Sequence, residues 1–205
     1  TYDCFVPLMS LPYKFKLQKT DLIPAGAYLR PDEAAFKKWE QRLKDFAEMK
    51  IGLAWQGNPA YPEDRNRSIP LRELKALIQN SKAHFFSFQK GFGSEQIQTE
   101  GLQKQIVDFS TELDIDGNSF LDTAALMSQM DLVITSDTSI VHLAGALGCK
   151  TWMLTQKVPD WRWGLSGEDS CWYSGLRLFR QESFFDWSGV VRNMQSALEV
   201  YRHGN

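Results

Sequence analysis

The amino-acid sequence predicts an α/β fold built on a doubly wound, mostly parallel sheet. From about residue 50 onward, short apolar runs typical of buried strands alternate roughly six times with helical patterns. Several of these runs stop at small or polar residues, as expected where a strand meets a turn. The composition, with 43% hydrophobic and 23% charged residues, provides enough apolar material for a core.

Residues 1–30 are not expected to form a domain by themselves. They carry Pro7, Pro12 and Pro24 between short apolar stretches. From Pro31 onward, apolar residues recur at helical spacing and predict an amphipathic helix that ends at about Met49. We therefore expect a linker and a connecting helix ahead of a compact domain.

The elements after residue 49 follow from the same patterns. A buried strand at 51–55 ends in the turn-forming residues Gln56-Gly57-Asn58-Pro59, and Pro70 opens a helix. Residues 94–104 are so polar that only a short or exposed helix is expected, and Asp114-Ile115-Asp116 is interpreted as a solvated turn. Further strands are predicted at 83–88, 106–109, 132–134, 151–154 and 176–179, and further helices after the caps Asp122 and Asp186 and after the polar turn 135–138.

The segment 131–154 has the clearest strand-turn-helix-strand pattern. The apolar run 132–134 stops at the small polar residues 135–138, and a helical pattern follows that ends near Gly148. The first amides of such a helix have no intrahelical acceptor and carry the positive end of the helix dipole, so this turn favours an anion such as a phosphate. His142 lies one turn after Thr138, and we expect its imidazole to overhang the anion site.

A simpler interpretation of this turn stays open from the local pattern alone. Ser, Thr and Asp are common at helix N-termini because their side chains satisfy free amides, and a single His on a helix is often structural. Neither residue type by itself identifies a ligand site.

Charge and composition exclude several functional classes. The net charge is −2 and no segment carries a basic stripe, so nucleic acid is not expected as a partner. No apolar run reaches membrane-spanning length and no signal peptide is visible, and the three cysteines without a CxxC pair indicate reduced thiols and a cytoplasmic location. The three histidines lie far apart, so no metal site is expected, and neither GxGxxG nor a P-loop follows any strand.

Five motifs in order carry a resemblance to a known family. They are the segments 51–59, 67–71, 122–127, 131–148 and 159–164, the last reading Pro-Asp-Trp-Arg-Trp-Gly. Together they resemble the carboxyl-terminal, donor-binding lobe of GT-B glycosyltransferases of the heptosyltransferase (family 9) and O-linked N-acetylglucosamine transferase kind, as found in bacterial tetratricopeptide (TPR) repeat proteins. The resemblance covers roughly residues 50–200 and implies a Rossmann-like lobe in residues 50–205. Residues 1–49 would then be the end of a preceding lobe, the linker and the connecting helix.

The resemblance also implies site residues and a reaction. Asp137 and His142 would be catalytic, in a turn whose Thr138 and Ser139 match the family's diphosphate-binding motif. No cofactor beyond the nucleotide-sugar donor and no metal is implied, because a helix N-terminus, hydroxyls and an Arg can neutralise the leaving diphosphate. The implied ligands of the nucleotide-sugar are Thr138, Ser139, Gln56, Gly57, Asn58, Arg67, Lys90 and Asp122.

Some of these roles have simpler alternatives in the sequence. Lys90 fits an exposed loop residue, Asp122 a plain helix cap, and Trp161 and Trp163 fit aromatic packing of a loop onto the sheet as well as walls of the donor pocket. The resemblance further implies a missing amino-terminal acceptor lobe, so that this chain alone is not expected to be active. A non-catalytic interaction module of a TPR-repeat protein and another GT-B enzyme, such as an epimerase or a phosphorylase, are the alternatives to a hexosyl- or heptosyl-type transferase.

Overall fold

Six parallel strands form one sheet in the order β3-β2-β1-β4-β5-β6. The computed structural model describes residues 2–24, 26–115, 117 and 120–203. The order reverses between β1 and β4, which confirms the predicted doubly wound α/β fold and places a topological switch point between these two strands. The strands are β1 (Lys50–Ala54), β2 (His84–Ser87), β3 (Ile106–Asp108), β4 (Leu132–Ser136), β5 (Thr151–Thr155) and β6 (Leu176–Arg180).

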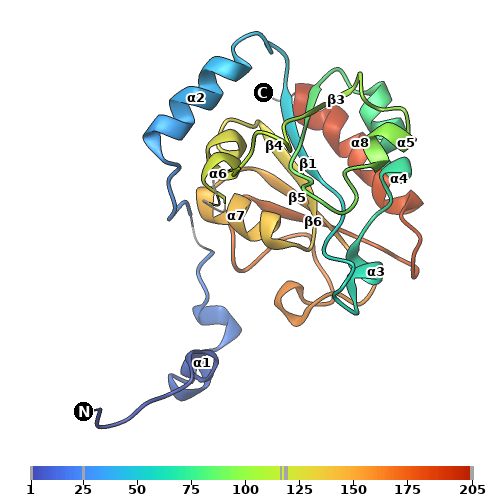
Figure 1. Ribbon diagram of the computed structural model, residues 1–205. Coiled ribbons are helices and arrows are strands. Elements are labelled where there is room, and N and C mark those ends of the chain that lie inside the picture. The colour runs from blue at the N-terminus through green and yellow to red at the C-terminus, as the bar shows by residue number, and fades with distance from the viewer. Residues whose placement is uncertain (1, 25, 116, 118–119, 204–205) are drawn as a thin grey trace.

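Helices cover both faces of the sheet (Figure 1). One face is covered by α4 (Leu71–Asn80), the one-turn α5 (Gln96–Thr99) and α8 (Ser188–His203), and the other by α2 (Glu33–Leu43), α6 (Leu121–Met127) and α7 (Ser139–Leu147). Because both faces are buried, the strands read as continuous apolar runs, and successive residues such as Leu132 and Val133 pack into opposite cores. The short elements are α1 (Leu11–Lys14), α3 (Asp64–Arg67) and the 3₁₀ turns Leu8–Ser10, Lys19–Asp21 and Trp161–Trp163.

Two boundaries differ from the sequence prediction for reasons of packing. Helix α2 ends at Leu43 and not near Met49, because the chain turns so that the Phe46 ring packs edge-on against Phe86 at 5.1 Å. Strand β4 continues to Ser136, because Thr135 and Ser136 are fully buried and pair with β5. The polar turn before α7 is therefore two residues shorter than predicted.

The start of α6 is capped from a distance, so the prediction that Asp122 caps this helix is wrong. Phe120 precedes the helix in a left-handed conformation with φ of 69°. The Asp114 carboxylate accepts hydrogen bonds from the backbone N–H of Asp122 at 2.8 Å and from the hydroxyl of Thr123 at 2.6 Å. Asp114 is thus an ordered capping residue and not part of a solvated turn, whereas Asp116 lies outside the described residues.

The amino-terminal segment extends away from the sheet below α7 (Figure 1). The backbone N–H groups of Tyr28 and Leu29 both donate to the Ala146 carbonyl, at 2.9 and 3.0 Å, and so join the segment to the end of α7. Helix α2 then packs on α6, where Trp39 is fully buried. Among the helices of the described residues, none has the length and apolarity that a membrane crossing needs.

Candidate functional site

A cavity of about 540 Å³ opens at the switch point, between the carboxyl ends of β1 and β4. This is the position at which doubly wound sheets bind ligands, because the loops after β1 and β4 lead to opposite sides of the sheet and leave a crevice. Polar groups from the β1 and β4 loops line one part, and aromatic side chains the other. The lining residues are Ala54, Gln56, Gly57, Asn58, Arg67, Phe88, Gln89, Lys90, Phe92, Asp114, Phe120, Thr123, Thr138, Ser139 and Ile140.

The N-terminus of α7 lies at the wall of this cavity. Thr138 is the N-cap in an extended conformation, and its hydroxyl accepts a hydrogen bond from the Ile140 N–H at 3.4 Å. Ser139, the first helical residue, is exposed and lines the cavity. The dipole of this nine-residue helix adds partial positive charge at the same place, which favours an anion.

Arg67 brings a full positive charge to the same wall. Its Nη1 donates to the backbone carbonyl of Asp137 at 2.8 Å, and its Nε donates to the Asp64 carboxylate at 3.0 Å. The guanidinium also lies over the Tyr61 ring, 4.7 Å from its centroid. Arg67 therefore ties the loop after β1 to the turn after β4 and holds a cation where the two loops meet.

Gly57 allows this arrangement because it has no side chain. A Cβ at position 57 would lie 2.1 Å from the Asp64 carboxylate and 2.7 Å from Nη2 of Arg67. The Gly57 N–H instead donates to the Ser68 hydroxyl at 3.0 Å, and that hydroxyl donates to Asp64 at 2.8 Å. Because Asp64 is buried, this hydrogen-bond network holds the Arg67 side chain in place.

Asp137 and His142 lie beside the cavity, and among the described residues neither lines it. The His142 ring stacks on Trp163 with centroids 5.5 Å apart, and its Nδ1 lies 3.0 Å from the Tyr173 hydroxyl. The imidazole thus packs against the loop after β5, not over the first turn of α7 as expected. Sequence patterns could not show this, because Tyr173 is 31 residues away.

The electrostatics of this pair reflect its half-buried position. Burial raises the pKa of Asp137, and the nearby Trp163 indole, His142, Arg162 and Arg67 oppose that rise only in part. The Trp163 indole N–H is buried and makes no hydrogen bond with the described residues, so it approaches the carboxylate without reaching bonding geometry. Burial also lowers the pKa of His142 against the attraction of Asp137, so the imidazole is neutral at pH 7.

Lys90 and Asp122 both serve structural contacts. The Lys90 ammonium lines the cavity but donates to the Leu113 carbonyl at 2.6 Å. Asp122 accepts from the Lys38 ammonium at 2.8 Å and from the Trp39 indole at 2.7 Å, and so holds α2 on α6. Burial raises its pKa, but these hydrogen bonds outweigh burial and the net pKa is lowered.

The structure thus brings seven of the ten sequence-predicted residues into one cavity. Six of them lie in the loop after a strand or at the start of a helix, and Arg67 ends α3; the seven are Gln56, Gly57, Asn58, Arg67, Lys90, Thr138 and Ser139. Asp137 and His142 lie next to the cavity, and Asp122 is engaged elsewhere. Sequence reasoning missed Phe88 and Phe92, which could have been found from their place in the segment that follows β2, and it missed Asp114.

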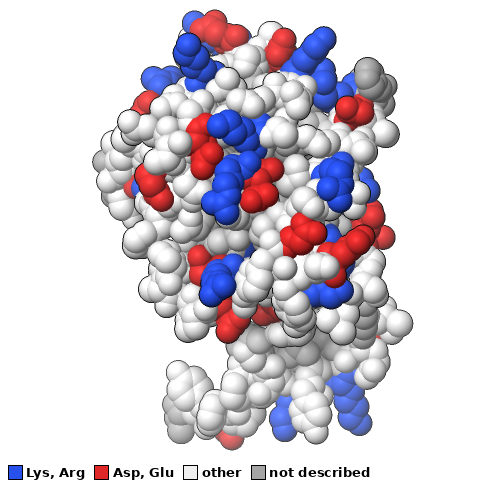
Figure 2. Space-filling view, turned by 90° about the vertical axis from the view of Figure 1, so that its right-hand side faces the viewer, with Lys and Arg blue, Asp and Glu red and all other residues white. Residues whose placement is uncertain are grey.

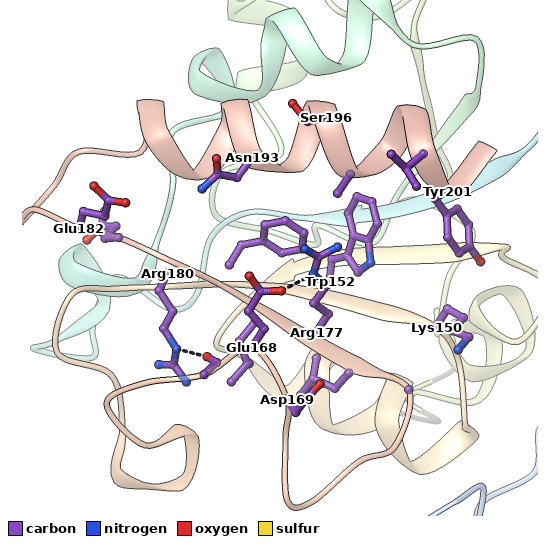
Figure 3. A pocket seen from close by; sticks show the side chains of 18 of the residues that line it. Lys150, Trp152, Glu168, Asp169, Arg177, Arg180, Glu182, Asn193, Ser196 and Tyr201 are labelled. Carbon is purple, nitrogen blue, oxygen red and sulfur yellow. Dashed lines mark hydrogen bonds and ion pairs between the residues drawn. The ribbon is translucent and has the colours of Figure 1, made fainter. Parts of the chain in front are cut away.

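A larger hollow, of about 1270 Å³, lies between β6 and α8 (Figure 3). Some of its charged side chains are already engaged: Arg177 pairs with Glu168 at 2.9 Å, and Arg180 donates to the Gly167 carbonyl at 2.6 Å (Figure 3). It lies along a strand edge and not at the switch point. The smaller cavity is therefore the candidate site.

The surface shows no field suited to nucleic acid on the face in view. Positive and negative side chains are interspersed there without a continuous patch of either sign (Figure 2). The described residues also contain no group of three acidic, His or Cys side chains placed to hold a metal ion.

Comparisons with known proteins agree with this fold. No protein-family model matches the chain. The protein FlbA of Caulobacter vibrioides is 28% identical over 184 residues, which are 86% of this chain and 29% of FlbA. This alignment leaves most of FlbA uncovered and by itself assigns no activity.

Heptosyltransferase structures are similar in fold. ADP-heptose lipopolysaccharide heptosyltransferase II of E. coli matches with a TM-score of 0.56 and 14% identity, over 86% of this chain and 54% of the enzyme. The E. coli heptosyltransferase WaaC with ADP matches with a TM-score of 0.52 and 14% identity, over 86% and 50%. The chain therefore shares the α/β fold of heptosyltransferases and spans about half of their length.

Proposed function

We propose that this chain is the nucleotide-sugar-binding half of a glycosyltransferase, which transfers a sugar from a nucleoside diphosphate to an acceptor. The observation that carries the proposal is the convergence of the α7 N-terminus and Arg67 on one cavity at the switch point. The similarity in fold between this chain and heptosyltransferases, one of which was solved with ADP, supports the same function.

In this proposal the diphosphate lies against the amides of α7 and the Arg67 guanidinium. Negative charge builds up on the leaving diphosphate as the sugar bond breaks, so fixed donors at this place stabilise the transition state more than the ground state. The amide groups and Arg67 are held by the β4 turn and the Asp64 network, so little reorganisation is needed during the reaction. No metal is required for this role.

Asp137 and His142 take the sugar side of the diphosphate in this proposal. The half-buried Asp137 carboxylate is an acceptor for a sugar hydroxyl in this proposal. His142, neutral and packed on Trp163, acts through Asp137 as a positioning residue. A further lobe that supplies the acceptor and TPR repeats remain proposed partners of the chain, and the proposed location is the cytoplasm.

Isothermal titration of the chain with ADP, GDP, UDP and CDP tests the proposal. Ser139→Glu places a carboxylate at the first position of α7, where it interacts favourably with the helix dipole but repels a diphosphate. We expect this variant to be as stable as the wild type or more stable, and to lose diphosphate binding. Ser139→Gln, of equal size without the charge, is the matched control and keeps most of the affinity.

Two results would count against the proposal. One is the absence of binding of every diphosphate at millimolar concentration, and the other is equal affinity of the Glu and Gln variants. The packing of His142 against Tyr173 also fits a non-catalytic interaction module with the same fold. Replacing Asp137 in the full-length parent separates the two, because a module would keep its phenotype.

A further inference from the structure

We propose that a second cavity, between the amino-terminal segment and the loop after β5, binds an apolar side chain of a polypeptide that carries a neighbouring basic residue. The cavity holds about 720 Å³ and is lined mainly by apolar side chains: Pro12, Leu17, Leu22, Trp161, Leu165 and Trp172. If the proposed function holds, the polypeptide bound in this cavity is the acceptor of the sugar. The binding of the polypeptide does not depend on the proposed function.

The apolar surface of this cavity is unusually open to water. Trp161 is 67% exposed and Leu165 82% exposed, although both belong to a loop with ordered contacts. The Trp161 and Trp172 rings meet edge to face at 6.1 Å and form one wall. Removing apolar area from water is favourable, so a ligand that covers both side chains would be bound favourably.

The loop is held rigidly despite this exposure. Arg180 at the end of β6 donates to the carbonyls of Trp163 at 2.6 Å, Gly164 at 3.0 Å and Gly167 at 2.6 Å. The Trp172 indole donates to the Arg162 carbonyl at 2.8 Å. Because the loop is ordered before a ligand arrives, binding loses little conformational entropy.

The charges on the rim favour a cation near the bound side chain. Arg162 is paired with Asp160 at 3.3 Å, so its charge is largely compensated. Asp169 lines the cavity, is exposed, and makes no ion pair with the described residues. A carboxylate beside an apolar cavity attracts the Lys or Arg of a ligand in which that residue neighbours an apolar residue. The same carboxylate repels the surface of an anionic membrane.

The position of the cavity connects it with the candidate site. In the 3₁₀ turn Trp161–Trp163, both Trp161 and Trp163 line the cavity, and Trp163 also packs on His142. A polypeptide anchored at Trp161 would thus bring its adjacent residues toward Asp137. This arrangement suits an acceptor held beside the donor.

Selection of a phage-displayed random dodecapeptide library on the chain tests the proposal. Affinities of enriched peptides are then measured for the wild type, for Trp161→Ser and for the matched control Phe184→Ser, which changes a 65% exposed aromatic residue outside this cavity. We expect peptides with an aromatic or leucine residue next to Lys or Arg, at least about tenfold weaker binding to Trp161→Ser, and unchanged binding to Phe184→Ser.

Three results would overturn the proposal: no enrichment, equal affinity for Trp161→Ser, or Trp161-dependent binding to vesicles of anionic lipid in place of peptides. Diphosphate titration of the same proteins separates this proposal from the previous one. Peptide binding without any diphosphate binding would support the peptide site and refute the proposed transferase.

Discussion

Arg67 is the residue at which stability and ligand binding can be separated most clearly. Replacing it with Met keeps the length of the side chain but removes the partner of the buried Asp64 carboxylate and the bond to the Asp137 carbonyl. Adding Asp64→Asn removes the unpaired charge while an acceptor for the Ser68 hydroxyl remains. The single and double variants therefore differ in stability but share the loss of the guanidinium.

The expected magnitudes follow from the contacts. Breaking a buried ion pair costs about 3–5 kcal/mol, and we expect about 3 kcal/mol here because the Arg67 side chain is 23% exposed. The double variant should regain most of that loss, because no charge is left buried without a partner. A hydrogen bond to a charged group contributes about 1.5–3 kcal/mol, so both variants should bind a nucleoside diphosphate about 10- to 150-fold more weakly.

Urea unfolding followed by far-UV circular dichroism measures the stability, and isothermal titration measures the affinity. An Arg67→Met variant as stable as the wild type would refute the reasoning about the ion pair. A double variant that is stable and binds diphosphate with wild-type affinity would show that Arg67 is structural only.

Three further predictions concern the network, the connecting helix and the buried carboxyl. Gly57→Ala should destabilise the protein by about 1–3 kcal/mol in urea unfolding, because the alanine Cβ would displace Asp64 and Arg67. The control Gly189→Ala in α8 should stabilise the protein by about 0.5–1 kcal/mol. Equal stability of the two variants would contradict this prediction. Trp39→Phe should lower the free energy of unfolding by about 1.5–3 kcal/mol at pH 7, because the hydrogen bond to Asp122 is lost. Because the pKa of Asp122 is lowered on folding, this difference should shrink as the pH falls below 4. A difference that does not change with pH would refute this role of Asp122. Burial raises the pKa of Asp137 on folding, so ionisation of this carboxyl destabilises the folded protein above that pKa. Asp137→Asn should therefore raise the midpoint of thermal unfolding at pH 7 but not at pH 3. A lower midpoint at pH 7 would be incompatible with this account.

The sequence predicted the fold well because the information was local. Buried strands in a parallel sheet are continuous apolar runs, and each run from residue 51 to residue 179 became a strand in the structure. The cavity residues were predictable for a related reason. Residues that directly follow a strand, such as Gln56 and Thr138, must lie at the carboxyl edge of the sheet whatever their side chains do.

Contacts between distant parts of the chain were not predictable. The direction of the His142 ring depends on Tyr173 and Trp163, and the cap of α6 depends on Asp114, which precedes the helix by several residues. Asp122 resembled a cap or a ligand by position, but α2 supplies its actual partners 83 and 84 residues away. Only the folded chain brings these groups together.

Amide chemical shifts recorded during a diphosphate titration test the central claim most directly. We expect the N–H resonances of Ser139, Ile140 and Gly57 to shift first and most strongly, because these residues line the cavity in which the phosphates are proposed to lie. Saturating shifts confined to other parts of the chain, such as the hollow between β6 and α8, would contradict the account.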